Sequence, residues 1–370
     1  MNTPVEQLKY QIALTLLPGV GSVLAKNLVS YCGSVEAIFK RKKYQLEKIP
    51  GIGSERADAI LNHEVFEKAE QEVLFIRKHK IKTFFYLDPD YPARLKNCED
   101  SPVLLFLKGE TNINHERMIA LVGTRNATPY GKQITEMLVE GFAKYNATIV
   151  SGLAYGIDII AHKAALKNNL PTIGVLAHGL DRIYPPVHKP VAEKMIHHGG
   201  VLTEFISKTN PDRENFPSRN RIVAGMTEAT IVIESATKGG ALITADIANS
   251  YNRDVFAVPG KVGEKYSEGC HELIRNNKAM LIESADQVAE VLNWNDDAGK
   301  KKESRQLKFF HELRPEEKKL VDLLLQNGKL DIDSLTIHAN MTTSKVSSTL
   351  LNLEFAGLLR SLPGKVYELV

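Results

Sequence analysis

The sequence of 370 residues is poor in cysteine and contains no C-x-x-C pair. Its three cysteines, Cys32, Cys98 and Cys270, are widely spaced, which argues against a disulfide framework and against a zinc ribbon. The first ten residues, MNTPVEQLKY, contain no basic stretch followed by an apolar one, so no secretion signal is expected. No apolar run approaches the roughly 20 residues needed to span a bilayer. We therefore expect a cytoplasmic protein without membrane insertion.

Charge of one sign is not in large excess, because 47 Lys and Arg stand against 44 Asp and Glu, for a formal net charge of +3. A nucleic-acid partner would therefore need a local basic patch, since the overall field is weak. The apolar content of 43% and the charged content of 25% are ordinary for a globular protein. A chain of this length is expected to contain two or three domains.

Common catalytic and cofactor motifs are also missing. The sequence contains neither G-x-S-x-G nor the phosphate loop G-x-x-x-x-G-K-[ST], and HELIR at 271–275 fails at the last position of the zinc motif H-E-x-x-H. Asp158 and His162, one helical turn apart, could form an acid–base pair or two metal ligands. We favour a structural role for both, because an aspartate near a helix N-terminus stabilises the helix dipole. No cofactor or metal is expected.

The first region, 1–80, contains an internal repeat. LPGVGSVLAKNLV (17–29) and IPGIGSERADAIL (49–61) share a Pro-Gly-aliphatic-Gly-Ser core followed by a helical run. The pair resembles the helix-hairpin-helix motif, which presents backbone N–H groups to a phosphate at a helix N-terminus. We therefore expect a helical domain of the helix-hairpin-helix/SAM-like kind at 1–80. The alternative is a small helical domain that uses glycine turns only for compact packing or for docking a partner protein.

The second region, 81–293, alternates short apolar segments with amphipathic helical ones, which predicts an α/β fold with a parallel sheet covered on both faces. Ligands of such sheets bind at the carboxyl ends of the strands, near a switch in strand order. The strand candidates are MIALV (118–122), ATIVS (147–151), TIGVLA (172–177), GVLTE (200–204), ATIVIE (229–234), DVFAVP (254–259) and AMLIE (279–283).

The last region, 310–370, follows a polar linker at 294–309. Three helical segments, starting at Pro315, and two short strands around a Pro363-Gly364 turn match the winged-helix pattern. Seven Lys and Arg against eight Asp and Glu give this region a net charge of −1. Because duplex binding normally leaves a basic footprint, a protein-contact or regulatory role is favoured over DNA reading.

The loop after the first predicted strand, in ALVGTRNATPYG (120–131), contains Gly123, Thr124 and Arg125. A dinucleotide loop needs a second glycine for close approach to the pyrophosphate, and this loop has a guanidinium group instead, which can fork onto a phosphate. The alternative is an arginine paired with a structural carboxylate. Gly152, after the next strand, could likewise expose backbone at a helix start.

The segment NPDRENFPSRNRIVAG (210–225) is predicted to be a long loop in which arginines surround a phenylalanine. Guanidinium groups beside an aromatic ring suit single-stranded nucleic acid, because they supply charge for the backbone and a flat face for a base. The alternative is a buried arginine network that braces the sheet. The candidate residues of this segment are Arg213, Phe216, Arg219, Asn220 and Arg221.

Two further loops complete this row of strand ends. Gly239 and Gly240 precede a helical segment and could form a backbone anion nest. Lys261 and Lys265 follow the next strand and would lie near the same rim. The row therefore predicts an anion-binding rim above the sheet.

Six motifs in this order are similar to those of the DNA-processing protein A (DprA/Smf) family. They are VGTRNATPYG, SGLAYGIDIIAH, LDRIYPP, FPSRNRIVAG, GGALITA and VFAVPG. The resemblance implies an extended Rossmann-like core between a helical N-terminal domain and a winged-helix C-terminal domain. It also implies binding of single-stranded DNA, a homodimer, and loading of the RecA recombinase during natural transformation, without catalysis. By position, Arg125 would be the main DNA-contacting arginine, with Gly123, Thr124 and the FPSRNR segment around it.

Two other functions are compatible with parts of the sequence. Nucleotide phosphoribohydrolases have a related fold and a glutamate near a strand end, for which Glu204 and Glu234 are the candidates. However, KGGALITAD (238–246) departs from the P-G-G-x-G-T-x-x-E motif of those enzymes in its third glycine and its glutamate. A transcription regulator working through the winged helix is the other possibility.

Overall fold

The computed structural model describes residues 4–294, 314–355, 358–362 and 365–369. These fall into two compact units, one up to residue 298 and the other from residue 299 onward. Apart from Trp294, the predicted linker lies outside the described residues, as does the predicted Pro363-Gly364 turn. None of the described helices is long and apolar enough to cross a membrane.

The first unit begins with a helical domain. Its helices are α1 (Val5–Thr15), α2 (Ser22–Cys32), α3 (Val35–Lys40), α4 (Lys43–Leu46), α5 (Ser54–Leu61) and α6 (Val65–Lys78). Both helices that were predicted to follow the repeated glycine hairpins are confirmed, because α2 starts directly after Gly21 and α5 directly after Gly53. Neither glycine offers a side chain to cap its helix, so the first-turn amides of both helices lack a side-chain acceptor at the N-cap.

A nine-stranded sheet follows in the described part of the first unit, with the order β1-β2-β6-β5-β4-β3-β7-β8-β9. The seven predicted strands are confirmed as β3 to β9 and are mutually parallel. The two remaining strands were not predicted, and both are antiparallel to their neighbours. The strands are β1 (Lys82–Phe85), β2 (Leu104–Gly109), β3 (Met118–Val122), β4 (Thr148–Ser151), β5 (Thr172–Val175), β6 (Gly199–Thr203), β7 (Ala229–Val232), β8 (Asp254–Ala257) and β9 (Met280–Leu281).

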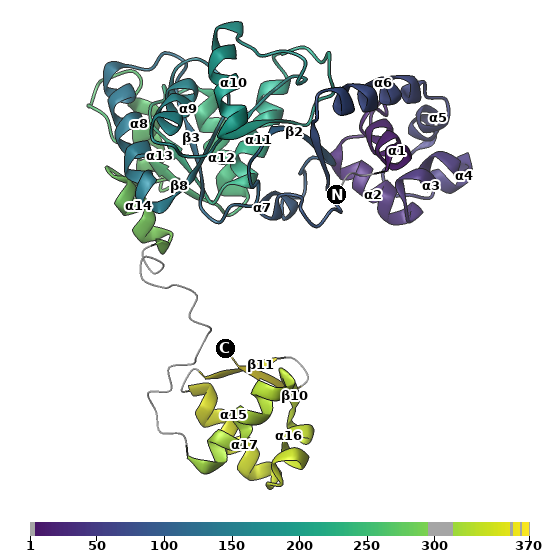
Figure 1. Cartoon of the computed structure of the whole chain (residues 1–370), viewed down its shortest axis with the longest axis vertical. Coiled ribbons are helices and arrows are strands. Elements are labelled where there is room, and N and C mark those ends of the chain that lie inside the picture. Colours follow the sequence, from purple (N-terminus) through teal and green to yellow (C-terminus); the bar gives the residue numbers. More distant parts are fainter. Residues whose placement is uncertain (1–3, 295–313, 356–357, 363–364, 370) are drawn as a thin grey trace. The chain divides into compact units, whose positions relative to one another are not determined.

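Helices cover both faces of this sheet, as Figure 1 shows. The strand β3 is buried along its whole length, so its side chains alternate between two apolar cores. Ile119 and Leu121 pack against one layer of helices, and Met118, Ala120 and Val122 pack against the other. The first layer contains α8 (Pro129–Phe142), α9 (Ile157–Lys167), α10 (Lys189–His197) and α14 (Ala285–Val291), and the second contains α7 (Ala93–Lys96), α11 (Asn215–Met226), α12 (Gly240–Ser250) and α13 (Glu268–Arg275).

Strand β2 joins the helical domain to the sheet. Leu105 and Leu107 point into the core beneath α11, whereas Leu104 and Phe106 belong to the core of the helical domain. Strand β1 does the same, because Phe84 lies in the core beneath α11 and Phe85 lies in the core of the helical domain. Both edge strands therefore pack against the helical domain on one face.

Strand order reverses at β3, whose neighbours are β4 on one side and β7 on the other. From β4 the chain proceeds outward to β6 and then returns to β7 beside β3. The loops after β3, β4 and β7 consequently open at one place along the carboxyl edge. This edge is where open α/β sheets bind ligands.

The second unit has a small helical core and a three-stranded sheet, among the residues described there. The three predicted helices and two predicted strands are confirmed, and a third strand was missed. The elements are α15 (Pro315–Asn327), β10 (Lys329–Asp331), α16 (Ile332–Ala339), α17 (Thr343–Phe355), β11 (Leu359–Leu362) and β12 (Val366–Leu369). Lys345 pairs with Glu316 at 2.6 Å, and Lys329 and Arg360 each pair with Glu368 at 2.6 Å.

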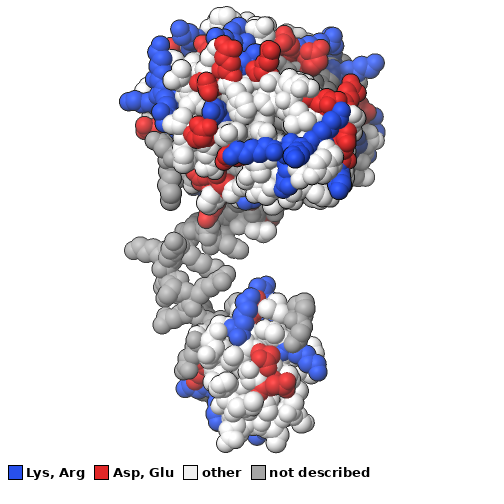
Figure 2. All heavy atoms as spheres, turned by 90° about the vertical axis from the view of Figure 1, so that its right-hand side faces the viewer, with Lys and Arg blue, Asp and Glu red and all other residues white. Residues whose placement is uncertain are grey.

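Charges of both signs are interspersed on the face seen in Figure 2. A row of Lys and Arg side chains crosses the middle of the first unit, and Asp and Glu side chains gather mainly above it. That face therefore has no continuous basic surface, in agreement with the small net charge of the sequence.

Candidate functional site

A groove of about 770 Å³ lies at the switch point of the sheet. Its walls come from the loops after β3, β4, β7 and β8 and from the N-terminal halves of α11 and α12. Ten of the twelve predicted site residues line it: Gly123, Thr124, Arg125, Gly152, Arg213, Phe216, Arg219, Asn220, Gly239 and Gly240.

The loop after β3 is held in place by the segment that directly follows β7. Thr124 donates its backbone N–H to the carbonyl of Glu234 at 2.8 Å, and its hydroxyl accepts from the N–H of Asn126 at 3.1 Å. At the end of the loop, the Thr128 hydroxyl caps α8 by accepting from the N–H of Gly131. This framework leaves Arg125 exposed at the tip, with no carboxylate within 4.0 Å in the described part of the chain. The predicted alternative, an arginine paired with a structural carboxylate, is therefore wrong for Arg125.

The N-terminus of α12 faces the same groove. Gly239 is its N-cap and Gly240 its first residue, and no side chain caps the helix. The space beyond Gly240 is open, so the first-turn amides can reach a ligand. Lys238 is exposed beside them. A helix N-terminus with a nearby cation favours an anion.

The segment predicted as a loop at 210–225 is helical from Asn215 onward, as α11. Pro217 is tolerated because it lies in the first turn, where its missing N–H has no helical acceptor. Phe216 lies at the groove, and the guanidinium carbon of Arg125 is 5.4 Å from the centre of its ring. An exposed cation and an aromatic face therefore meet at the groove wall.

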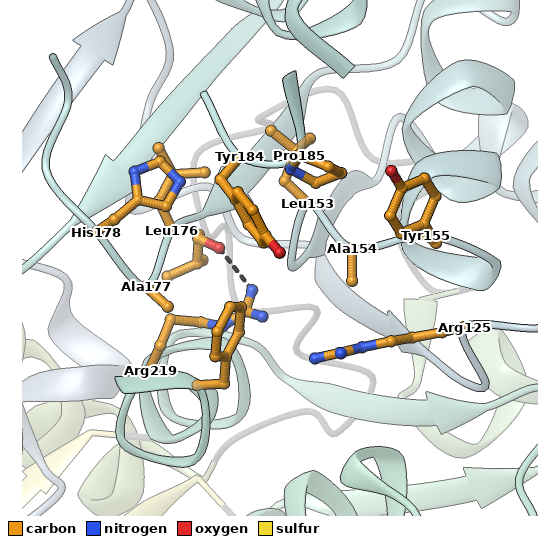
Figure 3. Close-up of a pocket in the computed structure, with 12 residues that line it drawn as sticks. Arg125, Leu153, Ala154, Tyr155, Leu176, Ala177, His178, Tyr184, Pro185 and Arg219 are labelled. Carbon is orange, nitrogen blue, oxygen red and sulfur yellow. Dashed lines mark hydrogen bonds between the residues drawn. The ribbon is translucent and has the colours of Figure 1, made fainter. Parts of the chain in front are cut away.

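A smaller pocket of about 70 Å³ opens beside the groove and shares Arg125, Phe216 and Arg219 with it. Figure 3 shows Arg125 and Tyr184 pointing toward its centre from two sides, with Tyr155 beside Ala154. Tyr155 is 52% exposed and Tyr184 is 47% exposed. The ring centres of Tyr184 and Phe216 are 6.5 Å apart. The pocket thus offers flat aromatic faces next to a cation.

A buried polar layer supports the groove from below. Arg219 is only 5% exposed and donates to the carbonyl of Val175. Burial raises the pKa of Asp158, and the positive charge of Arg219 opposes that rise. A Cβ at position 152 would lie 2.1 Å from Nη1 of Arg219 and 2.4 Å from Oδ2 of Asp158, so any larger residue would have to displace these two side chains. Arg219 braces the sheet, as the alternative interpretation of this segment proposed.

His162 belongs to the same layer and is fully buried. Its Nε2 donates to the carbonyl of Gly152 at 2.5 Å, and its Nδ1 lies 2.7 Å from the hydroxyl oxygen of Thr172. Burial lowers the pKa of His162 to about 4. The predicted structural role of His162 is confirmed, and no group of three or more metal-ligating side chains is found among the described residues.

Arg221 and Lys261 are not part of the groove, which corrects their predicted placement. Arg221 pairs with Glu204 and lines a different cavity with the hairpin around Gly19 of the helical domain. Consecutive residues of a helix point about 100° apart, so Arg221 cannot share the direction of Asn220. Lys261 is exposed elsewhere, and Lys265 lines the groove in its place.

The two glutamates considered for an enzyme both have structural partners. Glu204 is held by Arg221. Glu234 accepts from the N–H of Thr128 at 3.0 Å and from its hydroxyl. Neither is among the residues that line the groove.

Sequence reasoning missed the two tyrosines and Lys238. Tyr155 and Tyr184 occur within the motifs SGLAYGIDIIAH and LDRIYPP, but they were given no role. The available signal was weak: Tyr155 lies four residues after the end of β4, and Tyr184 lies nine residues after the end of β5.

Comparisons with known proteins give a consistent result. A family model described as "DNA recombination-mediator protein A" matches residues 82–293. A "SAM-like Helix-hairpin-helix tandem" model matches 12–63, and a "DprA winged helix domain" model matches 311–365. Protein Smf of Synechocystis is 31% identical over 97% of this chain and 98% of its own length.

Two solved structures are also similar. DNA processing protein A from Streptococcus pneumoniae is 32% identical, covering 78% of this chain and 98% of its own, with a TM-score of 0.64. DNA processing protein A from Helicobacter pylori is 30% identical, covering 58% and 97%, with a TM-score of 0.53. The Helicobacter pylori protein has a unique single-stranded DNA binding mode.

Proposed function

Because this chain belongs to the DNA recombination-mediator protein A (DprA/Smf) family, we propose that its groove binds single-stranded DNA. The observation that supports this most strongly is the pair formed by Arg125 and Phe216 at the switch point. The pair offers a guanidinium group for a phosphate and an aromatic face for a base, within 5.4 Å of one another. The N-terminus of α12 provides a second place for a phosphate across the groove.

The two cavities bind different parts of the DNA strand. The larger groove takes the sugar-phosphate backbone, and the smaller aromatic pocket between Tyr155, Tyr184 and Phe216 takes an unstacked base. Bases of a duplex are stacked and paired, so they cannot enter such a pocket without being extruded. The groove therefore prefers single strands, and it contacts them without reading sequence.

In the cell, this binding would protect incoming DNA during natural transformation and load the RecA recombinase onto it. The protein would act as a homodimer. We assign no bond-making or bond-breaking step to the groove, because the candidate glutamates are held by Arg221 and by Thr128.

The direct test compares single- and double-stranded oligonucleotides with the full-length protein over a range of salt concentrations. Fluorescence anisotropy should give tighter binding to the single strand and similar affinities for unrelated sequences. Equal or tighter binding to the duplex would contradict the proposal.

A second test concerns the base pocket. Phe216→Ala should weaken binding to oligothymidylate by about 5- to 100-fold, from the loss of base stacking, while leaving the salt dependence nearly unchanged. Lys132→Ala, an exposed cation on α8 that pairs with Glu136 at 3.9 Å, serves as the control. Wild-type affinity in the Phe216 variant would mean that the ring does not contact a base.

The rival activity is tested by incubating the protein with nucleoside monophosphates. Our proposal predicts no release of free base above background. Release that disappears in Glu204→Gln or Glu234→Gln would favour a phosphoribohydrolase.

A further inference from the structure

A buried carboxylate connects the helical domain with the loop that leads into the groove. Glu72 lies on α6 and is only 4% exposed. Its neighbours on the buried side of the helix, including Val73 and Ile76, are apolar. A carboxylate in such a place costs free energy unless it is hydrogen-bonded.

The partners of Glu72 come from a single residue 135 positions later in the chain. Ser207 donates both its backbone N–H, at 3.0 Å, and its hydroxyl to the same carboxylate oxygen. Burial raises the pKa of Glu72, and the two hydrogen bonds from Ser207 oppose the rise. Ile206, next to Ser207, also packs against the core of the helical domain.

Ser207 belongs to the loop 204–214, between β6 and α11. Further hydrogen bonds connect this loop to the groove. Asn210 accepts through its backbone carbonyl from the side chain of Asn215, at 3.1 Å. Asn215 is the first residue of α11 and directly precedes Phe216. The loop 204–214 is thus hydrogen-bonded to Glu72 through Ser207 and to the start of α11 through Asn210.

The same loop is tied to the opposite wall of the base pocket. Lys208 donates its N–H to Asp181 at 2.7 Å, and Arg182 donates to the side chain of Asn210 at 3.1 Å. Tyr184 lies three positions after Asp181 and two after Arg182, and it forms the other aromatic wall. The loop 204–214 is therefore bonded to the segments that hold Phe216 and Tyr184, and it sets the distance between the two rings.

We propose that Glu72 is a positioning residue through which the helical domain sets the width of the base pocket. This inference rests on the proposed binding of single-stranded DNA. Glu72 touches no DNA itself. It fixes Ser207, and the loop 206–210 then holds Phe216 and Tyr184 at the separation that accepts a base. Without the bond, the groove remains but the aromatic walls lose their spacing.

The test uses the full-length protein and two oligonucleotides, oligothymidylate and the same strand with one central abasic site. In the wild type, loss of the base should weaken binding. Glu72→Ala should weaken binding to oligothymidylate by about 3- to 10-fold, and the penalty for the abasic site should shrink. Glu72→Gln keeps an acceptor for Ser207 and should restore both values toward those of the wild type. Glu70→Ala, an exposed carboxylate on the same helix, should leave both unchanged.

Thermal unfolding of each variant separates positioning from stability. If Glu72→Ala lowers the melting temperature but, well below it, keeps the wild-type affinity and abasic penalty, Glu72 is merely structural and the inference is overturned. Failure of the wild type to bind oligothymidylate would instead overturn the proposed function.

Discussion

Arg125, in the loop after β3, and Arg219, on α11, both line the groove, but their surroundings differ. Arg125 is exposed, and its guanidinium group lies against the ring of Phe216. Arg219 is almost fully buried, donates to Val175 and balances the charge of Asp158. Arginine therefore has a different role at each level: it is available to a ligand at the groove surface, and it stabilises the fold in the buried polar layer.

The difference lies in where the guanidinium group finds its acceptors. Arg219 has an acceptor in Val175 and an opposite charge in Asp158, both supplied by the fold, so removing it costs stability. An exposed cation without an internal acceptor costs the fold little to remove and is available to a ligand. Variants at both levels should consequently separate stability from DNA binding.

The largest expected effect is that of Arg219→Ala. It leaves Asp158 buried without its cation and should lower the free energy of unfolding by about 3–5 kcal/mol. Urea unfolding at neutral pH measures this value, with Arg125→Ala as the matched arginine control, for which a change below about 0.5 kcal/mol is expected. Similar losses of stability in the two variants would contradict the assignment of Arg219 to the stability of the fold and of Arg125 to ligand binding.

Arg125→Ala should instead act on binding. The loss of charge-assisted hydrogen bonds to a phosphate should weaken oligonucleotide binding by about 10- to 100-fold, by similar factors for unrelated sequences. The slope of log affinity against log salt should also become shallower by about 0.7, the value for one phosphate of a single strand. Arg77→Ala, an exposed arginine on α6, should change neither. A loss confined to one sequence would contradict a backbone contact.

The buried layer also predicts a pH dependence. Because the pKa of His162 falls to about 4 in the folded state from 6.5 in the unfolded chain, the unfolded chain binds more protons between these values. The contribution to stability is complete above pH 6.5 and is lost as the pH falls toward 4. At pH 5 it should be about 2 kcal/mol smaller than at pH 8. Urea unfolding of wild type and His162→Gln at the two pH values tests this, since the variant should lack that part of the dependence.

The smallest effect should come from ending the chain at residue 304. In the winged helix, Lys329, Lys345 and Arg360 already pair with carboxylates. Its removal should therefore change single-strand affinity by less than about threefold. Loss of binding would mean that the winged helix makes the main DNA contact, and it would favour the function of a transcription regulator.

The sequence was sufficient to predict the parallel core, because strands such as Met118–Val122 are near-continuous apolar runs. It also placed Arg125 at the groove, since a loop that follows a central strand must open at the carboxyl edge. It could not separate Arg219 from Arg221, because their roles depend on the phase of a helix whose start at Asn215 was concealed by Pro217. The proximity of Tyr184 to Phe216 depends on loops that follow β5 and β6, and local sequence carries no signal of such a contact. The predicted domain boundary near residue 80 stays a prediction.

The side chains of β2 alternate between the core of the sheet and the core of the helical domain, which limits where the chain can be truncated. Leu104 and Phe106 are covered by the helical domain, and Phe85 on β1 lies in the same core. A chain starting at residue 82 would expose these side chains to water, at a cost of about 1.5–3 kcal/mol each. The uncovered sheet face would be a large apolar patch of the kind that drives self-association. The helical segment is thus an outer wall of the sheet, and the shortest soluble fragment should contain both.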